Sequence, residues 1–161
     1  MRDLLNAAEM KAVDQRSIEE YGIPSLVLME RAALEVVKRA RELLEPGLSG
    51  NEALEHGLGR ERLLKERKRK TVWAVCGFGN NGADGAAAAR MLTLQGFSSV
   101  ILLPSLEGKR SRELEVQLSV AEKLGIPILT LGDPLPEACD LIIDAVFGIG
   151  LSTVSYTHLT L

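Results

Sequence analysis

The stretch that decides the fold reads Cys76-Gly77-Phe78-Gly79-Asn80-Asn81-Gly82-Ala83-Asp84-Gly85. It follows an apolar, strand-like run at residues 71–75 and opens into an alanine-rich segment of helical composition. Glycine permits positive φ and the close approach of a backbone to a ligand, and the free N–H groups of a helix start attract anions. A strand, a glycine-rich loop and a helix in this order predict a ligand-binding loop.

Strand and helix patterns alternate along the rest of the chain. The apolar patterns predict strands at 71–75, 99–103, 127–131 and 141–146, and helices at about 7–20, 25–45, 84–95 and 111–124. Asn6 with Glu9 predicts a capping box for the first helix, and Ser25 is the predicted N-cap of the second, whose apolar stripe comprises Leu26, Met29, Ala33, Val36 and Ala40. This alternation predicts a three-layer αβα, Rossmann-like fold with a mostly parallel, doubly wound sheet, preceded by two N-terminal helices.

Right-handed crossovers predict the spatial order third, second, first, fourth for these strands. The carboxyl ends of the first and fourth strands then flank the topological switch point, where ligands usually bind. Those two ends carry Gly77–Gly85 and Asp144–Gly150, so we expect the two segments to meet in one crevice. The fourth strand would lie at an edge although its run Leu141-Ile142-Ile143 is typical of an interior strand, and we therefore expect a sheet that lacks its C-terminal strands.

Composition limits the classes of function. The chain has 161 residues, 46% hydrophobic and 25% charged, and a net charge of -3, which fits one globular domain without a general affinity for nucleic acid. Glutamates interrupt the basic run at 60–70 and no aromatic residue is interleaved, which favours a solvated helix face over a nucleic-acid site. No apolar run is long enough for a membrane span and no signal-peptide pattern is present, so we expect a cytoplasmic protein. Cys76 and Cys139 are interpreted as reduced core thiols.

The glycine-rich loop can be interpreted in three ways. Gly77 to Gly82 satisfies the dinucleotide pattern G-x-G-x-x-G, but no acid follows the second strand before Glu107, and the charge of Asp84 would oppose a pyrophosphate. The oxygens of Asn80, Asn81, Asp84 and Asp144 would suit a hard cation. The third interpretation is purely structural, with a turn at Asn80 and Asn81 and with Asp84 as a helix cap.

The loop resembles the hallmark G-x-G-N-N-G-G-D-G of the YjeF N-terminal domain family, the NAD(P)H-hydrate epimerases. Two further segments are similar to that family in the same order: Ala8–Asp14 with Tyr21–Ala33 near the start, and Asp144–Ser152, which matches D-A-[LIV]-F-G-x-G-L. The resemblance covers about residues 4–152, and we predict a YjeF N-terminal-like domain at 1–152 with a non-family tail at 153–161. The tail lacks the V-D-I-P-S-G motif of the family, so the site would be incomplete.

The resemblance implies an isomerase that interconverts the R and S epimers of hydrated NADH and NADPH in nicotinamide cofactor repair. It implies a potassium ion held by Asn81 and Asp144, a homodimer, and a functional partner in the ADP- or ATP-dependent NAD(P)H-hydrate dehydratase. Asp84 is our candidate catalytic residue, with Asp144 as a second possible proton shuttle. The implied substrate contacts are Asn80, Asn81, Gly82, Ala83, Asp84, Gly148, Ile149, Gly150, Leu151 and Ser152.

Two alternatives stay open beside the epimerase. Relatives of this domain occur in mRNA-decapping scaffolds and in lipoprotein-binding proteins, so the second hypothesis is a non-catalytic binding module of the same fold. An ordinary NAD-binding Rossmann domain ranks third, because the ribose-binding acid is missing. The chain also departs from the family at Ala83, where the hallmark has glycine, which is tolerable only if that residue has negative φ.

Overall fold

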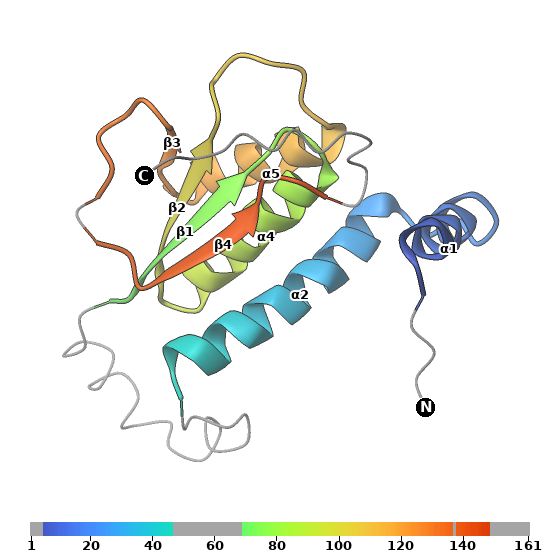
Figure 1. Cartoon of the computed structure of the whole chain (residues 1–161), viewed down its shortest axis with the longest axis horizontal. Coiled ribbons are helices and arrows are strands. Elements are labelled where there is room, and N and C mark those ends of the chain that lie inside the picture. The colour runs from blue at the N-terminus through green and yellow to red at the C-terminus, as the bar shows by residue number, and fades with distance from the viewer. Residues whose placement is uncertain (1–4, 47–68, 137, 149–161) are drawn as a thin grey trace, which may run out of the picture.

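The protein is built on one four-stranded parallel sheet. A computed structural model describes residues 5–46, 69–136 and 138–148 (Figure 1). The strands lie in the order β3-β2-β1-β4, as the crossover argument predicted. Their bounds are Thr71–Cys76 for β1, Ser98–Leu103 for β2, Ile128–Thr130 for β3 and Leu141–Ala145 for β4. The predicted α/β, Rossmann-like class is confirmed.

Three helices cover one face of this sheet. The helices are α1 (Ala7–Glu19), α2 (Ser25–Leu44), α4 (Asn80–Leu94) and α5 (Arg112–Lys123). Helices α4 and α5 pack on each other and on the sheet, and α2 runs along α4 (Figure 1). The second helical layer of the predicted three-layer arrangement is not found among residues 5–46, 69–136 and 138–148.

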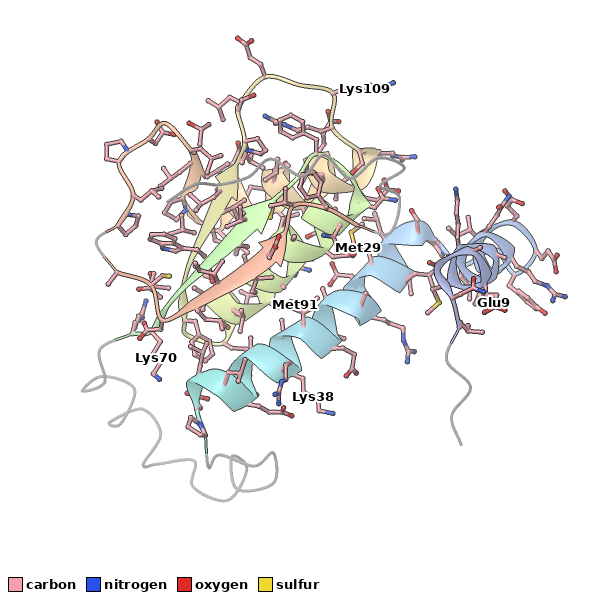
Figure 2. All side chains as sticks on the ribbon, viewed as in Figure 1. Glu9, Met29, Lys38, Lys70, Met91 and Lys109 are labelled. Carbon is pink, nitrogen blue, oxygen red and sulfur yellow. The ribbon has the colours of Figure 1, made fainter. Side chains whose placement is uncertain are left out.

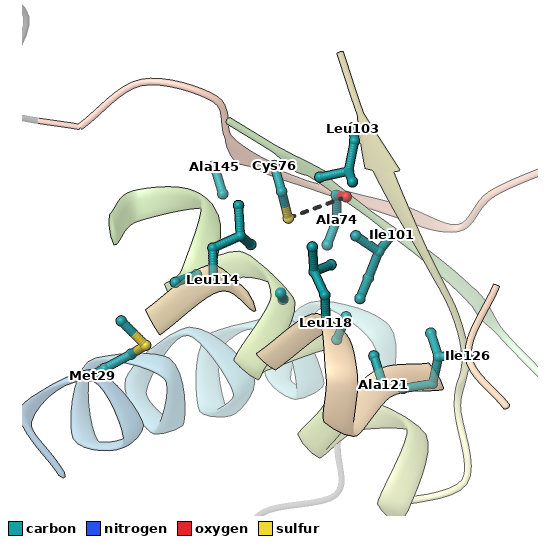
Figure 3. Close-up of a cluster of buried hydrophobic side chains, with 13 residues drawn as sticks. Met29, Ala74, Cys76, Ile101, Leu103, Leu114, Leu118, Ala121, Ile126 and Ala145 are labelled. Carbon is teal, nitrogen blue, oxygen red and sulfur yellow. Dashed lines mark hydrogen bonds between the residues drawn. The ribbon is translucent and has the colours of Figure 1, made fainter. Parts of the chain in front are cut away.

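The two faces of the sheet differ in burial because side chains alternate along each strand. Val72, Ala74 and Cys76 are fully buried under the helices and define what we call the covered face. Trp73 and Val75 alternate with them and are only half-buried. Strand register places Ile142 beside Trp73 on this second side, which we call the open face. Figure 3 shows the covered-face core, where Cys76 and Ile101 face Leu114 and Leu118 of α5.

A polar network ties the three covering helices together. Arg90 of α4 forms an ion pair with Glu30 of α2 at 2.5 Å, and its Nε donates to Gln117 of α5 at 3.1 Å. Gln117 in turn donates to Glu30 at 3.1 Å, so each of the three side chains contacts the other two. The network is mostly shielded from water, which strengthens its electrostatic contacts.

The N-terminal helices agree with the sequence in part. The capping box is confirmed, since Glu9 N–H donates to Asn6 at 3.0 Å and Asn6 N–H donates to Glu9 at 2.7 Å. The prediction that Ser25 caps α2 is wrong: Pro24 occupies the N-cap position, and the Ser25 hydroxyl donates to Glu113 of α5 instead. The apolar side chains of α1, including Met10, Val13 and Ile18, lie exposed.

The apolar stripe of α2 also needs one correction. Val37 is 3% exposed and belongs to the buried stripe, whereas the predicted Val36 is 37% exposed. The stripe advances by four residues at each of its first steps, which turns Val36 to its edge. Its members are Met29, Ala33, Val37, Ala40 and Leu44.

The remaining sequence predictions concern cysteines, membranes and undescribed segments. Cys76 and Cys139 are both free thiols, but only Cys76 belongs to the core, since Cys139 is partly exposed. Burial raises the pKa of Cys76 to about 12. Among the described residues, no helix is long and apolar enough to cross a membrane. Most of the basic run, residues 60–68, and the predicted tail at 153–161 lie outside the described residues.

Candidate functional site

Helix α4 begins directly in the glycine-rich segment. Its first residue is Asn80, and the preceding Gly79 is the N-cap with extended backbone, φ -91° and ψ -168°. The predicted start at Asp84 is therefore wrong by four residues. The purely structural interpretation also fails, because Asn80 and Asn81 are helical rather than a turn, and Asp84 lies in the second turn and caps nothing.

The glycines of this segment bring backbones together. A Cβ at Gly77 would overlap the Val146 carbonyl, and one at Gly82 would overlap the Gly77 carbonyl. A Cβ at Gly85 would lie 2.5 Å from that of Ala145. None of the three has positive φ, so the expectation of a left-handed ligand loop is not met at these positions. They instead let the start of α4 pack directly against the ends of β1 and β4.

Gly79 differs from these three glycines. A Cβ there would meet nothing within 4 Å. The residue is exposed and stands at the helix N-terminus, where unpaired N–H groups face outward. It is therefore the position in the segment where a ligand could approach the backbone.

Ala83 resolves the departure from the family hallmark. It is helical and fully buried, and no non-glycine residue among those described has positive φ. Alanine is therefore tolerated at this position, because an alanine in the α region of φ and ψ carries no backbone strain. The methyl group becomes part of the core cluster with Ala74 and Cys76.

The two predicted segments meet at Asn81. Its Nδ2 donates to the Phe147 carbonyl at 2.9 Å, and a Cβ on Gly148 would lie 3.1 Å from the Asn81 Cβ. The Gly77 N–H also donates to the Ala145 carbonyl at 3.0 Å. The start of α4 and the residues after β4 therefore form one continuous wall at the carboxyl edge of the sheet. Ile149, Gly150, Leu151 and Ser152 lie outside the described residues.

Asp144 reaches this edge from the other side of the sheet. Its register partner is Val75, so its exposed carboxylate belongs to the open face, while Asn81 belongs to a helix of the covered face. Asp144 Oδ1 accepts from the Val146 N–H at 3.1 Å. No hydrogen bond between described residues joins Asp144 to Asn81, and the common neighbour of the two is the segment that follows β4.

The donor chemistry at this edge fits a hard cation. The side-chain amide N–H of Asn81 donates to the Phe147 carbonyl, so the Asn81 Oδ1 stays available to a cation. Asp144 likewise keeps its second carboxylate oxygen. Oxygen ligands of this kind suit hard cations. The described residues contain no group of three or more His, Cys, Asp and Glu side chains that could hold a metal on their own.

Asp84 is the group at the site with unusual acidity. Its pKa is raised to about 6, first by burial and second by the like charge of Asp14 on α1. Both causes disfavour the ionised form. A carboxyl group that gains and loses a proton near neutral pH has the acidity that general acid-base catalysis needs. Sequence reasoning missed the contribution of Asp14, because a through-space neighbour 70 positions away leaves no local signal.

Comparisons with known proteins identify the relatives of this fold. The family model described as YjeF-related protein N-terminus matches residues 25–159. A protein named NAD(P)H-hydrate epimerase from Oenococcus oeni is 42% identical over 141 residues, which are 86% of this chain and 56% of that protein. One of the same name from Weissella koreensis is 38% identical over 153 residues, 94% of this chain and 58% of that protein.

A solved structure shows the same fold. The crystal structure of yeast ynu0 superposes with a TM-score of 0.70 at 23% identity, covering 95% of this chain and 60% of that one. The chain thus spans well under two thirds of the length of the relatives it matches.

Proposed function

This chain belongs to the YjeF-related protein N-terminus family, and we propose that its function is that of an NAD(P)H-hydrate epimerase, an isomerase acting on hydrated NADH and NADPH. The observation that carries the proposal is Asp84, a half-buried carboxyl group whose pKa is raised to about 6. It lies in the second turn of α4, which begins with Asn80 and Asn81, so this acid-base group and the two amides belong to the same end of one helix. The names of the relatives support the choice of substrate.

The chemistry needs one proton carrier. In the hydrate, the C6 hydroxyl is adjacent to the ring nitrogen. When protonated Asp84 gives its proton to this hydroxyl, water leaves and the nitrogen lone pair forms a C=N bond. Water then adds to either face of C6 and returns one proton to Asp84, so that the stereocentre is scrambled with no net change in atoms. A pKa near the working pH lets Asp84 both donate the proton and take it back.

We assign the other site residues to binding. Asn80, Asn81, Asp84 and Gly148 would contact the hydrate at the edge of the sheet, Gly82 and Ala83 through their backbone, and Ile149, Gly150, Leu151 and Ser152 through the phosphate-binding loop that they begin. Asn81 and Asp144 would hold a potassium ion, which supplies positive charge to substrate oxygens. Asp144 is then a cation ligand, which leaves Asp84 as the proton carrier.

The proposal extends to partners. The exposed apolar side chains of α1, such as Met10 and Val13, support a homodimer. The reaction restores no cofactor by itself, so we propose that it works with an ADP- or ATP-dependent NAD(P)H-hydrate dehydratase. The cytoplasmic location stays a prediction from the sequence.

The test is epimerisation of purified S and R hydrate by Asp84→Asn. We expect the rate, followed by chromatographic separation of the epimers in potassium buffer, to fall by about 100-fold because the proton carrier is lost. Glu122→Gln, an equivalent change on the exposed side of α5, should leave the rate unchanged. An unchanged rate in Asp84→Asn would remove Asp84 from the mechanism. Absence of epimerisation by the unmodified chain would favour the binding-module alternative.

A further inference from the structure

The loop that joins β2 to α5 is the cationic part of the described carboxyl edge. It runs through residues 104–111, and Lys109, Arg110 and Arg112 lie at its end and on the first position of α5. The other described segments that follow a strand at this edge, residues 77–79, 131–136 and 146–148, carry no lysine or arginine. Figure 2 shows Lys109 on the loop that arches beyond the strand ends, with its side chain pointing into solvent.

Two of the three cations of this loop are exposed to solvent. Lys109 and Arg112 are exposed, and neither forms an ion pair with another described residue. Arg110 donates from one terminal nitrogen to the Leu106 carbonyl, which closes the loop, while its buried Nε has no partner among the described residues. That Nε is closed off from solvent, so a bound phosphate would meet the exposed side chains of Lys109 and Arg112, because ammonium and guanidinium groups bind phosphate oxygens strongly.

The loop is coupled mechanically to the candidate site. The Ser111 N–H donates to the Phe78 carbonyl at 2.8 Å, inside the glycine-rich segment. Gly108, with φ of +141°, packs so closely on the Phe78 ring that a Cβ there would overlap it. Because of these two contacts, the loop backbone that carries the cations stands at a fixed position relative to Gly79 and the start of α4.

We propose that Lys109, Arg110 and Arg112 bind the 2′-phosphate that distinguishes hydrated NADPH from hydrated NADH. In doubly wound sheets that bind dinucleotides, the end of the second strand lies at the 2′ position of the adenosine ribose, where an acid binds the hydroxyl and a cation binds the phosphate. Here β2 ends in Leu102-Leu103 without an acid, and the cations follow. The inference rests on the proposed function, since it names a subsite for one of its two substrates.

The position of the reacting ring agrees with this assignment. Asp84 and Asn81 would hold the hydrated ring at the start of α4, beside the end of β1, and β2 is the neighbour of β1 in the sheet. Glu107 is the one carboxylate in the loop and opposes the cations. The loop should therefore favour the phosphorylated substrate without excluding the other.

The test compares binding of the two hydrates by isothermal titration of the 161-residue chain. We expect tighter binding of hydrated NADPH, and we expect Lys109→Ala and Arg112→Ala each to reduce that preference by about fivefold, as for an exposed ion pair. Affinity for hydrated NADH should be unchanged. Glu107→Gln should raise the preference. Lys123→Ala, the same loss of charge at the far end of α5, is the matched control and should have no effect.

The outcomes separate this inference from the proposed function. A loss confined to hydrated NADPH, which weakens as added salt screens the charges, supports the inference. Equal losses for both hydrates, or an unchanged preference, overturn it while the epimerase proposal stands. Binding of neither hydrate by the unmodified chain would overturn both. Arg110 is left intact in these variants because its bond to Leu106 shapes the loop, and circular dichroism of each variant verifies the fold.

Discussion

The covered and open faces of the sheet come from the same strands and yet differ in what they do. Val72, Ala74 and Cys76 are fully buried, whereas Ile142 on the open face is 55% exposed and Asp144 stands in solvent. Alternation along a strand assigns neighbours in sequence to different environments. We infer that the covered face carries most of the stability of the described part, and that the carboxyl edge between the two faces carries the chemistry.

The largest effect is expected from a cavity on the covered face. Ile101 has no exposed surface and lies in the core cluster with Ala74 and Leu118. Ile101→Ala should lower the free energy of unfolding by about 4 kcal/mol, through lost burial and a residual cavity. Urea unfolding followed by circular dichroism would measure this. A loss below about 1 kcal/mol would show that the covered face is not the main source of stability.

A smaller loss is expected where helix and strand backbones touch. Gly82→Ala places a methyl group on the Gly77 carbonyl, so α4 must shift away from β1, at a cost of about 3 kcal/mol. The matched control is Gly79→Ala, where the methyl group meets nothing and only the cap is weakened, by less than about 1 kcal/mol. Equal losses in the same urea experiment would mean that α4 does not pack as closely as the structure shows.

Asp84 makes stability depend on pH. Its folded pKa of about 6 lies above its ordinary value of 3.8, so the folded state keeps a proton that the unfolded chain has already lost. The contribution of Asp84 to stability is therefore full below pH 4, decreases as pH rises through 6, and is absent above that range. Because Asp84 is partly exposed, the change should be about 1 kcal/mol.

Two variants isolate this carboxyl group. Asp84→Asn should remove the decrease between pH 4 and 6, as measured by urea unfolding across that range. Asp14→Asn should remove only the smaller, electrostatic share of it, because burial is the larger cause of the raised pKa. An identical pH profile in Asp84→Asn would show that another group is responsible.

The smallest loss of stability is expected on the open face. Ile142→Ala removes the same type of side chain as Ile101→Ala but from the open face, where more than half of it is in water. We expect a change within about 0.5 kcal/mol. A loss close to that of Ile101→Ala in urea unfolding would mean that the open face is covered in solution.

Fold class and strand order could be predicted from the sequence. They follow from the spacing of apolar residues and from the right-handedness of crossover connections, which single residues hardly disturb. The start of α4 could not be predicted. Gly82 and Gly85 are helical residues whose missing side chains allow close packing on β1 and β4, and in a sequence such glycines are indistinguishable from those of a loop. The position of Val37 was missed for a related reason, because the stripe of α2 is set by the partner helix.

The candidate site was predicted as a set of residues and not as a geometry. Motif order placed Asn81 and Gly148 together, and the structure confirms their contact. It was not foreseeable that Asp144 reaches the edge from the open face, since that depends on the register of β4 against β1. The acidity of Asp84 depends on burial and on Asp14, and neither is a local property of the sequence.

The attachment of α2 has a consequence for how the chain could be divided. Helix α2 is joined to α4 and α5 by its apolar stripe and by Glu30, and none of these contacts belongs to a backbone ladder. A peptide of residues 5–46 should therefore associate in trans with a second polypeptide that begins at residue 69 and reconstitute the fold from two pieces. Such a split pair would turn the Glu30–Arg90 contact into an intermolecular one, whose strength could be titrated directly.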